Sequence, residues 1–282
     1  RKEYQIKTQS NYGYLELEEL TLFSEENISS LIRRASICIN LIGILYEKRK
    51  NHFKTIHTDF PSLLSKLAKK NNLKQFIHVS ALGIEDAIDS HYAISKLEGE
   101  REAKKNFNKT LILKPSIVYS VDDKFTTSLM TLLNRLPIMP LYYNGNTKFT
   151  PLHVTDLANI IFEVVQKKIV GETIECVGPE VLTFKDIILK IQNSINKKRI
   201  LIPMPLSLAK VTAKIFQMMP KPLLTMDQLN LLKYDNVVSG KYKTNFDFGI
   251  NSSKKFENEI NLYSFNWTSG GQFAKKNIQN NN

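Results

Sequence analysis

The chain alternates short apolar runs with longer amphipathic segments, and this alternation limits the folds that it can adopt. The predicted strands are 13–17, 36–45, 75–80, 110–114 and 172–177, and the predicted helices between them are 21–34, 53–70 and 92–105. Strands that are buried on both faces are continuous apolar runs, and an intervening helix carries the chain back to start the next parallel strand. The sequence therefore predicts an α/β fold with a doubly wound parallel, Rossmann-like sheet.

Two side chains near the start of the helix at 92–105 have a spacing that suits proton transfer. Tyr92 and Lys96 are four residues apart, so both project from one face of the helix, one turn apart. An ammonium beside a phenol favours the phenolate and lowers the phenol pKa from about 10. Ser80, at the end of the preceding strand, could complete a site that moves a proton to or from a carbinol oxygen. A Tyr and a Lys on the surface of an amphipathic helix would have the same spacing.

The Tyr92–Lys96 pair follows a strand that ends in Val79 and Ser80, and together these residues resemble the active-site motif of the extended and atypical short-chain dehydrogenase/reductases. This superfamily includes the NAD-dependent epimerase/dehydratases. The resemblance implies that Tyr92 is the acid/base and that Lys96 holds the nicotinamide ribose. It places the third catalytic residue of the family, a Ser or Thr, on Ala81. Either Ser80 serves instead, or the hydroxyl is missing and cofactor binding remains without turnover.

The same resemblance implies a set of residues around a dinucleotide, NAD(P)(H). The expected cofactor-binding residues are Asn40, Leu41, Ile42, Gly43, Val79, Ser80, Tyr92, Lys96, Pro115, Ser116, Ile117 and Val118. Gly43 has no Cβ and so allows a close approach of the cofactor, although a tight turn at the strand end would explain it equally well. No metal site is expected, because the five histidines show no metal-ligand spacing. His57, His78 and His153 are expected in the core or in the wall of a cleft.

No glycine-rich phosphate loop, which a dinucleotide-binding sheet carries after its first strand, can be written through the glycines of this chain. Either the fold lacks the loop, or the chain is N-terminally truncated by roughly 40 residues that carry it. We favour truncation, because the first recognisable element resembles the third strand of the family. Arg1 and Lys2 would then follow the second strand, where a basic residue can accommodate a 2′-phosphate, which weakly favours NADP(H) over NAD(H).

The resemblance covers residues 13–200 and suggests a division of the chain. The expected parts are a truncated dinucleotide-binding domain at 1–120 with return elements at 148–178, a small substrate or partner lobe at 121–147 and 179–250, and a partly disordered tail at 251–282. Within these parts Thr155 is expected to cap a helix that runs to 168, and Asp156 to support its start. A second capped helix is expected to start within 182–187.

The net charge of +12 raises the question of partners. Lysines and asparagines are scattered instead of forming one arginine-rich stripe, so no nucleic acid partner is expected, whereas attraction to anionic lipid or to an acidic protein stays open. The two cysteines lie in apolar strand-like runs and form no disulfide framework, which suggests a reducing compartment. No apolar run reaches the length of about 18 residues that a membrane span needs.

Residues 206–219 form an unusually apolar helical segment, in which Lys210, Lys214 and Gln217 are a narrow polar stripe. Such a helix is either buried in the small lobe or pressed against a membrane or a partner. Within the superfamily the chain resembles most the accessory NAD(P)H-binding subunit of respiratory complex I and its bacterial relatives, through segments such as 40–43, 76–80 and 184–186.

This likeness implies a structural or assembly protein that docks on a respiratory complex or a membrane surface through residues 203–235. The expected location is cytoplasmic or peripheral on the inner membrane of the bacterial cell or mitochondrion. The alternative is an active NAD(P)-dependent epimerase/dehydratase or reductase. Such an enzyme would act on a sugar nucleotide or on another carbonyl or alcohol substrate.

Overall fold

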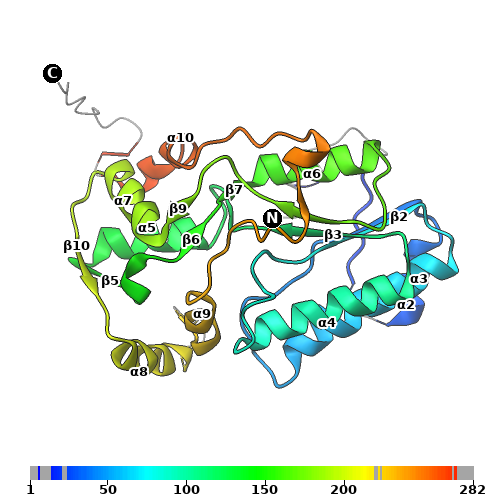
Figure 1. The fold of residues 1–282 in the computed structure, drawn as a ribbon, viewed down its shortest axis with the longest axis horizontal. Coiled ribbons are helices and arrows are strands. Elements are labelled where there is room, and N and C mark those ends of the chain that lie inside the picture. The colour runs from blue at the N-terminus through cyan, green and yellow to red at the C-terminus, as the bar shows by residue number, and fades with distance from the viewer. Residues whose placement is uncertain are drawn as a thin grey trace.

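A computed structural model describes residues 6, 14–20, 24–218, 222, 224–268 and 270–271. Its centre is a five-stranded sheet in the order β1-β2-β3-β8-β11, in which every neighbouring pair is parallel (Figure 1). The strands are β1 (Ile37–Asn40), β2 (Gln75–Val79), β3 (Thr110–Pro115), β8 (Thr173–Cys176) and β11 (Lys243–Thr244). The predicted parallel α/β fold is therefore confirmed.

Helices cover both faces of this sheet (Figure 1). On one face lie α2 (Glu25–Ile32), α3 (Phe60–Lys70) and α4 (His91–Asn106), and on the other lies α6 (Val154–Gln166). Neighbouring residues of β2 show the two faces, because Phe76 packs with α2 and α3, whereas Ile77 packs with α6. Side chains that alternate along a strand in this way bury both sides of the sheet, so β2 lacks a polar face.

Several ends of the predicted elements are right, but β1 stops at Asn40, so the strand predicted over 36–45 is too long. Ser24 caps α2 by accepting a hydrogen bond from the backbone N–H of Asn27, and Thr183 forms a capping box with Asp186 at the start of α7 (Phe184–Ser194). The predicted helix at 53–70 begins as a π-helical turn, η1 (Lys54–Asp59), before it continues as α3.

Two further local predictions are wrong. Residues 14–17 form no strand, because no neighbouring strand pairs with them, while Gly13 lies outside the described residues. Thr155 does not cap α6; the Nδ1 atom of His153 accepts the backbone N–H of Thr155 at 3.3 Å instead. Asp156 lies in the first turn as expected, where its carboxylate accepts the backbone N–H of Lys254 at 3.1 Å.

A second lobe stands at one end of the sheet and has its own apolar core (Figure 1). Its strands are β4 (Val118–Tyr119), β5 (Ile138–Leu141), β6 (Lys148–Phe149), β7 (Leu152–His153), β9 (Leu182–Thr183) and β10 (Ile200–Pro203), and its helical elements besides α7 are α5 (Phe125–Arg135), η2 (Tyr142–Gly145), α10 (Phe256–Asn261) and η4 (Ser264–Trp267). A 3-10 turn, η3 (Phe246–Phe248), follows β11. Phe256 and Ile260 of α10 are buried in this core, although the sequence assigned them to a tail.

The apolar segment at 206–219 forms α8 (Leu206–Gln217), which packs on α9 (Met226–Leu231). Only Ala209 and Ala213 of α8 are buried, and they contact Leu229 of α9. The opposite face is open to solvent: Leu208, Val211 and Ile215 are 51%, 53% and 59% exposed. Burial within the lobe therefore does not account for most of the apolar surface of α8. Among the described residues, no helix combines the length and apolarity required to cross a bilayer.

Candidate functional site

The predicted pair Tyr92 and Lys96 lies where strands β1 and β2 end. The Lys96 Nζ atom donates a hydrogen bond to the carbonyl oxygen of Val79, the last residue of β2, at 3.2 Å. The same ammonium lies 5.9 Å from the centroid of the Tyr92 ring. A Cβ on Gly43 would stand 3.4 Å from Nζ, so the glycine after β1 leaves open the space beside the ammonium. The expected site residues of α4, β1 and β2 thus meet at the carboxyl edge of the sheet.

A third side chain, His57 of η1, completes this cluster. Its Nε2 atom accepts the backbone N–H of Ile44 at 3.1 Å, which makes Nδ1 the protonated nitrogen, and Nδ1 lies 2.9 Å from the Ser95 hydroxyl. Its ring meets the Tyr92 ring edge-on, with centroids 5.3 Å apart. The sequence indicated only a core or cleft-wall role for this histidine, because nothing in its spacing links it to Tyr92.

His57 reaches the site because η1 and α4 approach each other unusually closely. A Cβ on Gly99 of α4 would stand 1.8 Å from the carbonyl oxygen of His57. Only a glycine permits that contact, so Gly99, one turn after Lys96, fixes how deep η1 lies against α4.

The pKa shifts of the pair differ from the sequence-based prediction. Burial lowers the pKa of Lys96 to about 8, with Glu100 opposing the shift. Burial, assisted by the nearby charge of Asp227, raises the pKa of Tyr92 to about 12. The expected lowering of the phenol pKa is therefore wrong for this state of the protein, because lost hydration of the phenolate outweighs an ammonium that stands over the ring.

Asn40 and His78 form the floor of the cluster. They are register partners in β1 and β2, and the Asn40 Nδ2 atom lies 3.0 Å from His78 Nδ1, while Asn40 Oδ1 accepts the backbone N–H of Ile42 at 3.1 Å. Burial lowers the pKa of both His57 and His78 to about 3, so both rings are neutral at physiological pH. Asn40 is thus a positioning residue for the turn after β1, whereas Leu41 of that turn is 65% exposed.

The hydroxyl of Ser80 has a partner within the protein. It donates a hydrogen bond to the Glu100 carboxylate, which also accepts one from Lys114 Nζ at 3.0 Å. The same ammonium pairs with Glu85. Ala81 instead packs in the apolar cluster that contains Tyr92. The structure therefore brings Tyr92 and Lys96 together and ties Ser80 into a buried charge network that joins Glu100 of α4 to Lys114 of β3.

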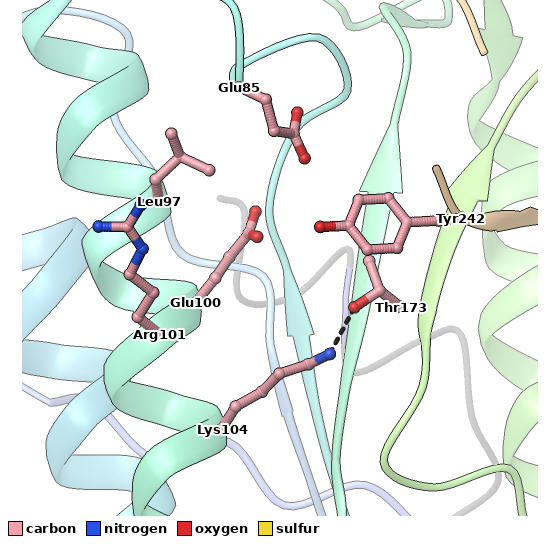
Figure 2. Close-up of a pocket in the computed structure, with 7 residues that line it drawn as sticks. All are labelled: Glu85, Leu97, Glu100, Arg101, Lys104, Thr173 and Tyr242. Atoms are coloured by element: carbon pink, nitrogen blue, oxygen red, sulfur yellow. Dashed lines mark hydrogen bonds between the residues drawn. The ribbon is translucent and has the colours of Figure 1, made fainter. Parts of the chain in front are cut away.

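A pocket of about 270 Å³ opens beside this network (Figure 2). Its walls come from α4, β8 and two loops, and the lining residues are Glu85, Leu97, Glu100, Arg101, Lys104, Thr173 and Tyr242. Lys104 Nζ spans one side of it and donates to the Thr173 hydroxyl at 2.6 Å (Figure 2). Glu100 is the link between this pocket and Ser80, but Tyr92 and Lys96 are absent from its lining.

The remaining expected residues run from Pro115, the last residue of β3, to Val118, the first of β4, and Asn236 holds the two between them. The Asn236 Oδ1 atom accepts hydrogen bonds from the Ser116 hydroxyl and from the backbone N–H of Ile117, the latter at 3.2 Å. The Asn236 amide donates to the carbonyl oxygen of Leu82. No spacing rule predicts this contact, which joins positions 119 residues apart.

Similarity to known proteins is found at the level of sequence and of fold, while no family model matches the chain. The NADH-ubiquinone oxidoreductase 40 kDa subunit, mitochondrial, of Neurospora crassa is 24% identical over 248 residues, which cover 87% of this chain and 65% of that protein. The NADH dehydrogenase [ubiquinone] 1 alpha subcomplex subunit 9, mitochondrial, of Arabidopsis thaliana is 26% identical over 76% of this chain and 56% of its own length. The chain thus spans somewhat less than two thirds of these curated relatives.

Solved structures share the fold at lower identity. The dTDP-glucose 4,6-dehydratase of Bacillus anthracis in complex with NAD has a TM-score of 0.66 and 15% identity, covering 94% of this chain and 83% of that one. The UDP-glucuronic acid 4-epimerase of Bacillus cereus, in complex with UDP-glucuronic acid and NAD, has a TM-score of 0.65 and 18% identity, with 92% and 84% covered. The chain is therefore a homologue of the mitochondrial NADH dehydrogenase subunits named above, and its fold is that of the NAD-dependent epimerase/dehydratases.

Proposed function

We propose that the chain is an NAD(P)(H)-binding accessory protein of a respiratory NADH dehydrogenase of the complex I type, with a structural or assembly role. Its sequence relatives carry the names of such subunits. The observation that carries the proposal is the position of the hydroxyls: Ser80 is bound to Glu100, and Ala81 packs in the cluster beside Tyr92. This arrangement supports a site that binds a dinucleotide without turnover, because the Ser80 hydroxyl already bonds Glu100 and Ala81 has no hydroxyl.

Two features beside the strand ends, the Lys96 ammonium of α4 and the open space at Gly43, support binding of a nicotinamide dinucleotide. Lys96 has a buried ammonium with one hydrogen-bond partner among the described residues, so it can still donate to the two hydroxyls of a ribose. The open space at Gly43 lets a ribose or phosphate lie against the turn that Asn40 holds. When bound, the nicotinamide would supply hydride chemistry. The weak preference for NADP(H) belongs to Arg1 and Lys2, which lie outside the described residues.

The docking part of the proposal concerns residues 203–235. The exposed apolar face of α8 stands beside Lys210 and Lys214, and the helix contains no acidic residue. An apolar stripe flanked by lysines suits an anionic membrane surface at which a respiratory complex is embedded. Because both relatives are named as mitochondrial, we infer a peripheral position at the inner membrane of mitochondria or at its bacterial equivalent.

Fluorescence titration with NADPH and NADH tests the cofactor part. We expect Lys96→Met to weaken binding by at least about 10-fold, since it removes the ribose donor, and Tyr92→Phe to retain binding within about 3-fold. NADPH is expected to bind more tightly than NADH. Co-purification with respiratory NADH dehydrogenase subunits should be the same for the native chain and for Tyr92→Phe. If Lys96→Met binds each dinucleotide as tightly as the native chain does, the assignment of the site is wrong.

An active epimerase/dehydratase or reductase is the alternative, and the direct proximity of Tyr92 and Lys96 favours it. In that case Tyr92 would exchange a proton with the substrate oxygen while hydride passes to or from the nicotinamide. Nicotinamide absorbance that changes with a sugar-nucleotide or another carbonyl substrate, and that is abolished by Tyr92→Phe, would replace the structural role with this one. Ser80→Ala adds a control, since a hydroxyl bound to Glu100 should not affect turnover.

A further inference from the structure

Helix α9 contacts both the docking helix α8 and the helix that carries Tyr92. In Figure 1 it lies between α8 and α4. Met226 and Leu229, one turn apart, pack with the buried face of α8. Asp227 and Asn230, also one turn apart, face α4. A single short helix is therefore the common neighbour of the two features on which the proposed function depends.

The contact with α4 is made at its N-terminus. Asp227 accepts hydrogen bonds from the backbone N–H of His91 at 2.7 Å and of Tyr92 at 3.2 Å. It also accepts one from the hydroxyl of Ser90, the N-cap of α4, at 2.9 Å. Asn230 Nδ2 donates to the carbonyl oxygen of Asp89 at 2.8 Å.

These bonds supply what α4 lacks by itself. The first N–H groups of a helix have no partner within it, and the positive end of the helix dipole favours an anion. The first turn of α4 contains no acidic residue. Asp227, which is 135 residues away from Tyr92 in the sequence, provides that carboxylate. It thereby fixes the turn from which the Tyr92 side chain projects.

Helix α9 is also held by contacts with α8. Gln217 of α8 accepts the backbone N–H of Met226 at 3.2 Å, and Leu229 is fully buried against Ala209 and Ala213. A helix of six residues is too short to be stable alone in water, so α9 depends on contacts with its neighbours, and α8 and α4 are two of them. Both neighbours therefore contribute to the stability of folded α9.

We propose that α9 couples the outer face of α8 to the Tyr92 site, so that dinucleotide binding and docking at α8 strengthen each other. The coupling rests on the proposed function, which supplies the two ligands. Each ligand orders one neighbour of α9 and so favours the state in which α9 is folded. By thermodynamic linkage, docking changes the affinity for the dinucleotide by the same factor by which the dinucleotide changes the affinity for the docking surface. Asp227 is the positioning residue through which the effect passes.

Titration of the full chain with NADPH, in the absence and presence of vesicles of phosphatidylcholine and phosphatidylglycerol, tests the coupling. In the native chain we expect vesicles to tighten NADPH binding by about 5-fold or more. Asp227→Asn keeps the shape and one acceptor oxygen of the side chain, so the protein should fold and bind each ligand separately. Its NADPH affinity should be the same with and without vesicles.

The control variant is Asp89→Asn, which removes a charge near the contact between α9 and the N-terminus of α4. The Asp89 carboxylate makes only an exposed ion pair with Lys233, at 3.6 Å, and accepts no hydrogen bond from the first turn of α4 among the described residues. Asp89→Asn should therefore keep the native response to vesicles. A native response in Asp227→Asn, or a loss of response in both variants, would overturn the proposal.

Hydrogen–deuterium exchange separates the coupling from the proposed function. NADPH alone should slow exchange in α9 of the native chain and leave α9 unchanged in Asp227→Asn. If vesicles do not bind, the docking role fails, and this measurement still decides the coupling. If NADPH does not bind, the cofactor role fails, and vesicle-induced protection of the His91 and Tyr92 amides decides it. If bound NADPH leaves the exchange rates of the α9 amides unchanged in the native chain, the coupling is contradicted.

Discussion

Two buried lysines, Lys96 of α4 and Lys114 of β3, have opposite electrostatic surroundings. Lys96 is 5% exposed and donates one hydrogen bond, to the carbonyl oxygen of Val79, and burial lowers its pKa to about 8. Lys114 is fully buried; burial acts to lower its pKa too, but the carboxylates of Glu100 and Glu85 outweigh that effect and raise it. A buried cation with two anions has its bonding satisfied by the fold. A buried cation whose partner is a single carbonyl oxygen still has N–H donors for a ligand. We therefore treat Lys96 as a site residue and Lys114 as a scaffold residue.

The largest expected effect follows from removing the paired lysine. Lys114→Met leaves the Glu100 and Glu85 carboxylates without their cation, and the free energy of unfolding should fall by about 3–5 kcal/mol. Lys104→Met is the matched control, because within the described part of the chain Lys104 bonds only the neutral Thr173 hydroxyl, and its loss should cost about 1 kcal/mol. Urea unfolding of both variants measures the difference. Equal losses would mean that Lys114 is no more a scaffold residue than Lys104.

The next effect compares two glycines that differ in what a side chain would meet. Gly99→Ala would bring a Cβ to 1.8 Å from the His57 carbonyl oxygen, so η1 must move, at a cost of roughly 1–3 kcal/mol. Gly43→Ala would place a Cβ 3.4 Å from Lys96 Nζ, which fills the cofactor space without disturbing a helix contact. Urea unfolding should detect the first substitution and NADPH titration the second. A stable Gly99→Ala with native NADPH affinity would show that the contact between η1 and α4 is adaptable.

The histidines next to Lys96 predict a dependence of stability on acid. Burial lowers the pKa of His57 and His78 to about 3, so below the unfolded value near 6.5 the unfolded chain binds more protons. Unfolding free energy must then fall as pH falls, by roughly 1 kcal/mol per histidine at about pH 5.5. Urea midpoints of His57→Gln and His78→Gln should change less between about pH 7 and 5.5 than those of the native chain.

Much of this arrangement was accessible from the sequence, because local periodicity decides it. The runs at β2 and β3 predicted a parallel sheet, and the spacing of Tyr92 and Lys96 placed both on one side of α4. The alternation of side chains at 13–17 wrongly predicted a strand, because a strand also needs a neighbouring strand to pair with. The caps show the same limit: a threonine is a better N-cap by propensity than a histidine, but His153 is the residue in position.

The unpredicted parts of the site come from contacts between distant segments. His57 depends on a π-helical turn and on the bare backbone of Gly99, and neither gives a periodic signal. Asp227 and Asn236 act on residues more than a hundred positions away, through single hydrogen bonds that no spacing rule covers. The sequence left open whether Ser80 supplies the catalytic hydroxyl or whether that hydroxyl is missing. The answer depends on where the Glu100 carboxylate lies.

The smallest effect, and the one that tests the comparison of the two lysines most directly, is the pH dependence of dinucleotide binding. If the Lys96 ammonium holds the ribose, NADPH affinity should be constant near pH 7 and fall by roughly 4-fold at about pH 8.5, as a group with a pKa of about 8 loses its proton. Stability should change in the opposite direction. Between pH 8 and about 10 the unfolded chain binds more protons at Lys96 than the folded one, so this lysine makes unfolding free energy rise with pH.

Opposite trends in affinity and stability exclude general alkaline unfolding as the cause of weaker binding. Tyr92 does not interfere, because burial holds its pKa at about 12, above the range of the titration. Lys96→Met should bind NADPH weakly and with little dependence on pH. Native affinity that stays constant to about pH 9 would mean that the ammonium takes no part in holding the dinucleotide, and the distinction between Lys96 as a site residue and Lys114 as a scaffold residue would then be lost.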